Sequence, residues 1–204
     1  MTSQAHILVI GGGPAGLAAA IAARQKGFCV LVADACSPPL DKPCGEGLLP
    51  PGVEALRSLG VELSSEIAFP FRSIRFADKD ASATAPIPHQ SGFGLRRTTL
   101  HRMLVDRATA VGVELLWNAR ISLLGQERLA VNGEPFEARW YVGADGRNSA
   151  VRSWAGLAPP RPGRARFGFR RHYRVVPWTD SVEVYWVRNT KSWLRPSAPL
   201  RFAW

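Results

Sequence analysis

The sequence predicts an α/β chain organised around a parallel sheet, and three observations carry this prediction. The apolar segment 7–10 leads directly into a glycine-rich turn and then into an alanine-rich, helix-forming segment, 17–23. A second apolar run, 28–33, follows that helix after Gly27. A distant run, 140–144, again precedes a glycine turn and a helix start. Continuous apolar runs separated by helices are typical of parallel strands that are covered on both faces.

The turn after the first strand has the spacing Gly-x-Gly-x-x-Gly, formed by Gly11, Gly13 and Gly16. Gly11 permits a tight turn, Gly13 lets the backbone approach a phosphate, and Gly16 lets the helix pack close to the strand. The helix that begins at Pro14 and Ala15 would offer free N–H groups and the positive end of its dipole to a pyrophosphate. We therefore expect these five residues to bind a dinucleotide in a Rossmann-like domain.

The second strand ends at Asp34, eighteen residues after Gly16. An acidic side chain near this position accepts hydrogen bonds from an adenosine ribose, and Ala35 beside it is assigned to the same cofactor site. An acid here favours a ribose with free hydroxyls, hence FAD or NAD over NADP. The alternative interpretation is a βαβ unit with an incidental cluster of glycines.

A second glycine turn lies far along the chain and bears on the choice between FAD and NAD. The 140–144 strand is followed by Asp145 and Gly146, and Asn148 or Ser149 could cap the next helix. Together with the first turn, this motif resembles FAD-dependent oxidoreductases of the aromatic hydroxylase and geranylgeranyl reductase type. In that family the Asp of an Asp-Gly motif lies near the flavin pyrophosphate and the approach path of the nicotinamide cofactor. The resemblance implies that Asp145 and Gly146 bind FAD and that NAD(P)H is the electron donor.

Two further segments resemble the same family, in the family order. Segment 95–104 is similar to its Arg-x-x-Leu-x-x-x-Leu helix start, which implies that Arg97 contacts the cofactor. Segment 41–48 is similar to the Pro-Cys-Gly-x-Gly loop of the reductase branch, which runs beside the isoalloxazine ring. The resemblance therefore adds Cys44 and Gly45 to the cofactor site. Ile121 is expected to pack by the adenine.

The remaining segments predict short helices at 53–59 and 98–110, and hairpins at 69–90 and 129–138. His101 lies on the second helix and is interpreted as a packing or surface histidine, because no partner that would make it a base is evident. Cys29, in an apolar run, is expected in the core.

Three parts of the chain follow from these elements. Residues 1–158 are expected to form the FAD-binding domain, with the hairpin 69–90 contributed to the substrate side. Residues 159–187 are expected to begin a substrate-side β-sheet after a Pro-rich linker. Residues 188–204 have no clear period and are expected to be irregular. The strands expected in the substrate-side sheet are 167–176 and 181–187.

The composition limits the other function classes. Residues 1–150 hold 15 basic and 14 acidic side chains, whereas residues 151–204 hold 11 and 2. The basic residues of this tail are scattered among Pro, Gly and Trp without a nucleic-acid motif, so we expect no nucleic-acid partner. Three cysteines without metal-ligand spacing indicate no metal site and a cytoplasmic location. No transmembrane segment is predicted, while peripheral membrane contact and oligomeric state are left open.

The sequence also departs from the family it resembles. Those flavoproteins are roughly twice as long and carry a late Gly-Asp pair, and no Gly-Asp dipeptide occurs here. We interpret the chain as a truncated or frameshifted product, in which the residues from about 188 are out of frame. The resemblance implies an NAD(P)H-linked monooxygenase or double-bond reductase acting on a small organic or isoprenoid-like substrate, with no catalytic acid or base assigned. The alternative is a catalytically inactive nucleotide-binding fragment of such an enzyme.

Overall fold

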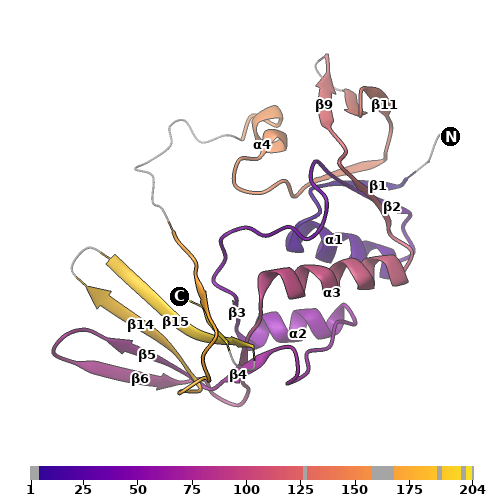
Figure 1. Ribbon diagram of the computed structural model, residues 1–204. Coiled ribbons are helices and arrows are strands. Elements are labelled where there is room, and N and C mark those ends of the chain that lie inside the picture. The colour runs from indigo at the N-terminus through magenta and orange to yellow at the C-terminus, as the bar shows by residue number, and fades with distance from the viewer. Residues whose placement is uncertain (1–4, 126–127, 158–167, 188–189, 199–200, 204) are drawn as a thin grey trace. The chain divides into compact units, whose positions relative to one another are not determined.

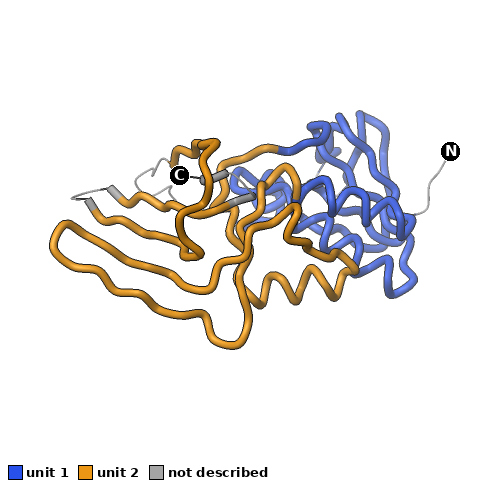
Figure 2. Tube along the Cα trace, turned by 60° about the horizontal axis from the view of Figure 1, so that its bottom comes forward, with its two compact units in different colours: residues 1–40, 100–165 blue, residues 41–99, 166–204 orange. Residues whose placement is uncertain are grey.

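The computed structural model describes residues 5–125, 128–157, 168–187, 190–198 and 201–203. The chain divides into two compact units, each built from two separate stretches (Figure 2). Unit 1 comprises residues 1–40 and 100–165, and unit 2 comprises residues 41–99 and 166–204. This division differs from the expected one, because the whole of 41–99 joins the second unit and not only the hairpin 69–90.

A four-stranded parallel sheet forms the centre of unit 1. Its strand order is β12 (Trp140–Gly143), β1 (Ile7–Ile10), β2 (Val30–Asp34) and β8 (Glu114–Trp117). In the central strands, β1 and β2, every residue from Leu8 to Ile10 and from Val30 to Ala33 is buried, which explains their continuous apolar sequence. The register sets Ile10 level with Ala33 and Gly143, so the three predicted strands end at one edge of the sheet. The parallel sheet predicted from the sequence is confirmed.

Three helices are adjacent in the chain to strands of this sheet: two follow a strand and one precedes a strand (Figure 1). Helix α1 (Pro14–Gln25) begins at a proline, whose missing N–H is not needed there, and it buries Leu17, Ala20 and Ile21. Helix α3 (Arg97–Ala110) buries His101, Leu104 and Ala108. Helix α4 (Ala150–Trp154) is capped by Ser149, whose Oγ accepts the Arg152 N–H at 2.9 Å.

A small antiparallel sheet completes unit 1 and contains one of the predicted hairpins. Its strands are β9 (Ile121–Leu124), β10 (Arg128–Val131) and β11 (Glu134–Phe136). Asn132 and Gly133 join β10 to β11 with φ angles of +53° and +88°, as a two-residue hairpin turn requires. Leu129 and Val131 extend the core of the parallel sheet through this hairpin.

In the part of unit 2 that the structure describes, two sheets accompany one helix, α2 (Pro50–Ser58). The larger sheet has the order β13-β16-β15-β14-β5-β6, and the smaller has the order β3-β7-β4. The hairpin expected within 69–90 is confirmed as β5 and β6, whereas 69–71 pairs with β7 in the smaller sheet. The strands of unit 2 are β3 (Gly47–Leu48), β4 (Phe69–Phe71), β5 (Ser73–Ala77), β6 (Ser82–Pro86), β7 (Gly92–Gly94), β13 (His172–Tyr173), β14 (Ser181–Val187), β15 (Thr190–Ala198) and β16 (Arg201–Ala203).

The C-terminal segments correct three sequence-based expectations. The tail from 188 was expected to be irregular, but it forms β15 and β16, because β14 presents a strand edge with which β15 pairs antiparallel. The strand expected over 167–176 is reduced to His172–Tyr173. Cys29 is exposed and not part of the core. The Pro-rich linker near 159–163 lies outside the described residues.

No helix within the described parts of the chain is both long and apolar enough to cross a membrane.

Candidate functional site

The glycine turn between β1 and α1 has the geometry that its spacing predicts. Gly11 adopts a φ of +110°, and a Cβ placed on it would lie 2.4 Å from the carbonyl oxygen of Ala144. A Cβ on Gly16 would lie 1.9 Å from the carbonyl oxygen of Gly11. A Cβ on Gly13, by contrast, would meet no atom within 4 Å. Two glycines are therefore required by the protein itself, while Gly13 borders open space at the N-terminus of α1.

Asp34 ends β2 beside this turn and holds it in place. Its Oδ2 accepts the Gly12 N–H at 2.7 Å, and its Oδ1 accepts the Cys36 N–H at 2.8 Å. A carboxylate has about four acceptor positions, so both oxygens retain capacity for ribose hydroxyls. Ala35 follows at the surface. The structure thus gives Asp34 a second role, the fixing of the glycine turn.

Two residues that the sequence analysis did not assign to the site hold the same turn from the other side. His101 is fully buried on α3, and its Nε2 donates to the carbonyl oxygen of Gly12 at 2.8 Å. The ring of Trp117, at the end of β8, packs against Gly12 so closely that a Cβ there would lie 2.4 Å from it. It also contacts the His101 ring edge-to-face. Asp34, His101 and Trp117 together fix the peptide unit of Gly12.

Of the two interpretations of His101, a packing or a surface histidine, the structure confirms the first, and the hydrogen bond to Gly12 gives the packing a specific role. No local signal in the sequence links His101 or Trp117 to Gly12, because 89 positions separate the hydrogen-bonded pair.

Asp145 lies on the neighbouring turn, at the end of β12. Its Oδ2 accepts the N–H groups of Ala150 and Val151 at 2.7 and 3.2 Å. Its Oδ1 is buried and accepts no hydrogen bond from the described residues. Burial acts to raise the pKa of Asp145, but the Ser149 hydroxyl and these N–H groups outweigh it and hold the pKa below its ordinary value. The carboxylate is ionised at neutral pH and holds the start of α4 through its Oδ2.

The structure therefore brings most of the predicted cofactor residues to one edge of the unit 1 sheet. Gly11, Gly13, Pro14, Gly16, Asp34, Ala35, Asp145 and Gly146 lie at or just beyond the carboxyl ends of β1, β2 and β12. Open sheets bind dinucleotides at this edge. Ala15 lies in the first turn of α1, and Ile121 begins β9 and packs on the unit 1 core. Contact between Ile121 and an adenine stays a prediction.

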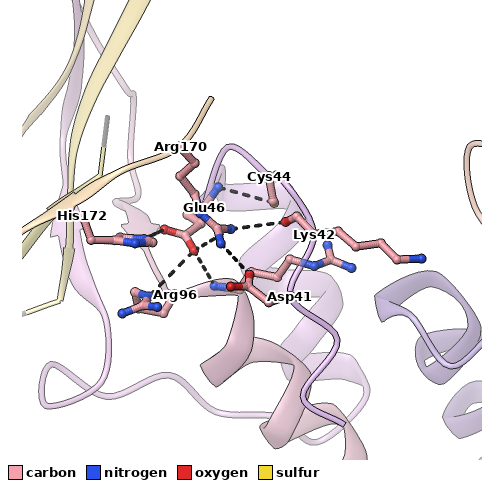
Figure 3. A network of polar contacts seen from close by, with 8 residues as sticks. Asp41, Lys42, Cys44, Glu46, Arg96, Arg170 and His172 are labelled. Atoms are coloured by element: carbon pink, nitrogen blue, oxygen red, sulfur yellow. Dashed lines mark hydrogen bonds and ion pairs between the residues drawn. The ribbon is translucent and has the colours of Figure 1, made fainter. Parts of the chain in front are cut away.

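Cys44, Gly45 and Arg97 belong to unit 2, where they surround a carboxylate that the sequence analysis did not single out. Glu46 is buried, with its side chain only 1% exposed, and has a φ of +52°. His172 Nε2 lies 2.7 Å from Glu46 Oε2, and the Arg97 N–H donates to Oε1 at 2.9 Å (Figure 3). In the sequence, the position of an acidic residue between two glycines of segment 41–48 could have pointed to Glu46.

Arginines complete this network around Glu46. Arg170 Nη1 lies 3.1 Å from Glu46 Oε1, while Arg170 Nη2 donates to Asp41 Oδ1 at 2.5 Å. This hydrogen bond from Arg170 lowers the pKa of Asp41. Arg96 Nε lies 3.9 Å from Glu46 Oε1. Cys44 is exposed, and its Sγ accepts the Glu46 N–H at 3.4 Å. Glu46 has a left-handed backbone conformation that favours glycine, and the ion pairs and hydrogen bonds of its side chain hold it there.

Comparisons with known proteins agree with this geometry. The family model described as an FAD binding domain matches residues 4–200. The chain is 33% identical over 168 residues to digeranylgeranylglycerophospholipid reductase 2 of Methanopyrus kandleri, covering 75% of this chain and 40% of that protein. It is 29% identical over 163 residues to the putative FAD-dependent monooxygenase YetM of Bacillus subtilis, covering 72% and 43%.

A solved structure gives the same result for the fold. The tetrameric form of 2-methyl-3-hydroxypyridine-5-carboxylic acid oxygenase is 25% identical and superimposes with a TM-score of 0.78, covering 98% of this chain and 58% of that one. The chain thus spans less than half the length of both relatives above. The family match extends through residue 200 and so includes most of the tail, whose origin as an out-of-frame segment stays a prediction.

Proposed function

Because the chain belongs to the FAD-binding-domain family, we propose that it binds FAD and acts as an NAD(P)H-linked oxidoreductase, or forms the N-terminal part of one. The proposed substrate is a small organic or isoprenoid-like molecule, which is hydroxylated or reduced at a double bond. This choice is supported by two relatives, one named a monooxygenase and one a reductase.

The observation that carries the proposal is the open space beside the backbone of Gly13. Gly11 and Gly16 touch their own backbone surroundings, but no protein atom comes within 4 Å of the position where Gly13 would carry a Cβ. The N-terminus of a twelve-residue helix begins at this point. A phosphate can therefore approach the backbone there and accept free N–H groups with the favourable end of the helix dipole.

The neighbouring side chains fit the rest of an adenosine diphosphate group. Asp34 has acceptor positions for the ribose, and Asp145 and Gly146 are proposed as further cofactor contacts on the basis of the family resemblance. FAD, when bound, supplies the hydride and oxygen chemistry, and the protein supplies position and electrostatics. Cys44, Gly45 and Arg97 in unit 2 are proposed as further cofactor contacts on the basis of the family resemblance.

A direct test is the absorbance spectrum of the purified full chain, reconstituted with FAD and passed through gel filtration. Flavin bands that stay with the protein at a 1:1 ratio are the expected result. Oxidation of NADH and NADPH by this complex, followed at 340 nm, then tests the electron donor. A folded protein that never retains FAD would contradict the proposal.

A second candidate is favoured by the length of the match. Since the chain spans 40% and 43% of these two relatives and contains no Gly-Asp dipeptide, it is also a candidate for an FAD-binding fragment without turnover. FAD retention without oxidation of either nicotinamide would support this candidate over the enzyme.

All three cysteines are unpaired, and on that basis we propose a cytoplasmic location.

A further inference from the structure

Arg195 in unit 2 takes no part in the network around Glu46, although it lies against the same loop. It belongs to β15, and its guanidinium packs over two glycines of that loop. A Cβ on Gly45 would lie 2.9 Å from Arg195 Nη1, and a Cβ on Gly47 would lie 3.1 Å from it. The guanidinium therefore fits against the loop only because these two residues have no side chain.

The other arginines of unit 2 that reach into its interior have acidic partners. Arg170 pairs with Asp41 and Glu46, and Arg75 pairs with Glu183. Within the described residues, Arg195 makes neither a hydrogen bond nor an ion pair, and its guanidinium carbon lies 5.9 Å from the centre of the Trp193 ring. Burial of this guanidinium lowers the pKa of Arg195, and the charge of nearby Glu46 offsets only part of this effect. A partly desolvated cation without an anion is costly to the folded protein.

Glu46 compensates this charge only in part, because its carboxylate oxygens are already bound to other groups. Glu46 is shared by Arg170, His172, Arg96 and a backbone N–H. Arg96 itself is incompletely satisfied, since its Nε is buried and donates to none of the described residues. Three arginines thus face two carboxylates, which leaves the cluster short of one negative charge.

The loop beside Arg195 is accessible from solvent. Cys44, Gly45 and Gly47 are exposed, and Trp193 is 47% exposed. A ligand can reach the guanidinium past residues that carry no side chain, and its apolar part can lie on an aromatic surface. The charge-assisted, two-pronged hydrogen bonding of arginine is suited to carboxylates and phosphates.

We propose that Arg195 binds an oxyanion group, a carboxylate or a phosphate, of an otherwise apolar or aromatic substrate. The identification of this ligand as the substrate rests on the proposed function, whereas the anion site does not. The cofactor's own phosphates are assigned to the glycine turn in unit 1, and segment 41–48 is the loop proposed to contact the flavin. A substrate anchored at Arg195 would therefore be held beside the loop proposed to contact the cofactor.

The test measures thermal unfolding of the full chain without FAD, at constant ionic strength, with added benzoate, phenyl phosphate or the neutral analogue benzamide. We expect benzoate, phenyl phosphate or both to raise the unfolding temperature saturably, and benzamide to have no effect. Which anion acts distinguishes the carboxylate from the phosphate. In Arg195→Met the anion should bind about tenfold more weakly or worse. Arg195→Lys should recover part of the binding, and Arg57→Gln, which removes an exposed charge in the same unit, should bind as the wild type does.

Stability without ligand separates recognition from a structural role. Arg195→Met should be at least as stable as the wild type, because it removes a partly buried charge that its surroundings compensate only in part. The proposal is overturned if Arg195→Met is clearly less stable, if it binds the anions unchanged, if benzamide acts as well as benzoate, or if neither anion acts on the wild type. Competition of added FAD with the anion would assign Arg195 to the cofactor and also overturn it. Anion binding through Arg195 in a chain that retains no FAD would refute the proposed function alone.

Discussion

Two substitutions in the glycine turn should have separate effects, one on cofactor binding and the other on the stability of the fold. Gly13→Ala and Gly16→Ala add the same methyl group three residues apart. At Gly13 the new Cβ meets no atom within 4 Å, whereas at Gly16 it lies 1.9 Å from the carbonyl oxygen of Gly11. We expect the first change to abolish FAD binding in a folded protein and the second to destabilise the protein itself.

The magnitudes follow from these distances. Ordinary contacts of a Cβ begin near 3.4 Å, so at Gly16 the helix must retreat by well over 1 Å from a backbone atom. Overpacking of this kind costs typically about 1–3 kcal/mol, and the gain of about 1 kcal/mol from alanine in a helix offsets only part of it where the clash is severe. A net loss of about 2 kcal/mol would lower the unfolding temperature by about 4–8 °C in a chain of this size.

Gly13 is the N-cap of α1, with a φ of −71° that alanine adopts without strain. Alanine is a poorer N-cap than glycine, but it reduces the entropy of the unfolded chain by about 0.4–1 kcal/mol, so stability should change little. The methyl group occupies the space where a phosphate would approach. We expect the affinity for FAD to fall at least about tenfold, the equivalent of about 1.4 kcal/mol.

The assay combines thermal unfolding of the apo-proteins with titration of FAD, followed by quenching of flavin fluorescence. Wild-type affinity for FAD in Gly13→Ala would refute the assignment of the phosphate to this turn. Wild-type stability of Gly16→Ala would refute the close helix–strand packing on which the turn depends.

Three further predictions concern the side chains that hold the turn. Asp34→Asn leaves one oxygen for two N–H donors, so urea unfolding should show a loss of about 1 kcal/mol, together with weaker FAD binding; unchanged values of both would contradict its role. His101→Leu removes the hydrogen bond to Gly12 and should cost about 1–3 kcal/mol in the same assay, whereas His101→Gln should recover part of it; equal losses in the two variants would show that packing alone matters. The lowered pKa of Asp145 means that its ionised form stabilises the fold above about pH 4 and that this contribution is lost as the pH falls through the folded-state value. Asp145→Asn should therefore be less stable than the wild type at pH 7, and the gap should close in acid; a gap independent of pH would contradict this.

The sequence alone determined the parallel sheet, its order of strand, turn and helix, and the glycines of the cofactor turn. These features are local: the burial of Leu8 to Ile10 appears as an apolar run, and the positive φ of Gly11 or Gly133 appears as a glycine. Short-range sterics and hydrophobic periodicity act within a few residues, so they can be recognised without the fold.

Only the tertiary structure decided how distant residues meet. His101 is 89 positions from Gly12, and His172 is 126 positions from Glu46, and no periodicity links such pairs. The tail from 190 forms a strand because β14 offers it an edge, although its own composition does not predict one. Arg195 is the clearest case, since it is one of many arginines in a basic tail and becomes a partly buried charge without a hydrogen-bonded anion only where the fold packs it against Gly45 and Gly47. Burial and pairing of charge depend on three-dimensional surroundings, which the order of residues alone does not specify.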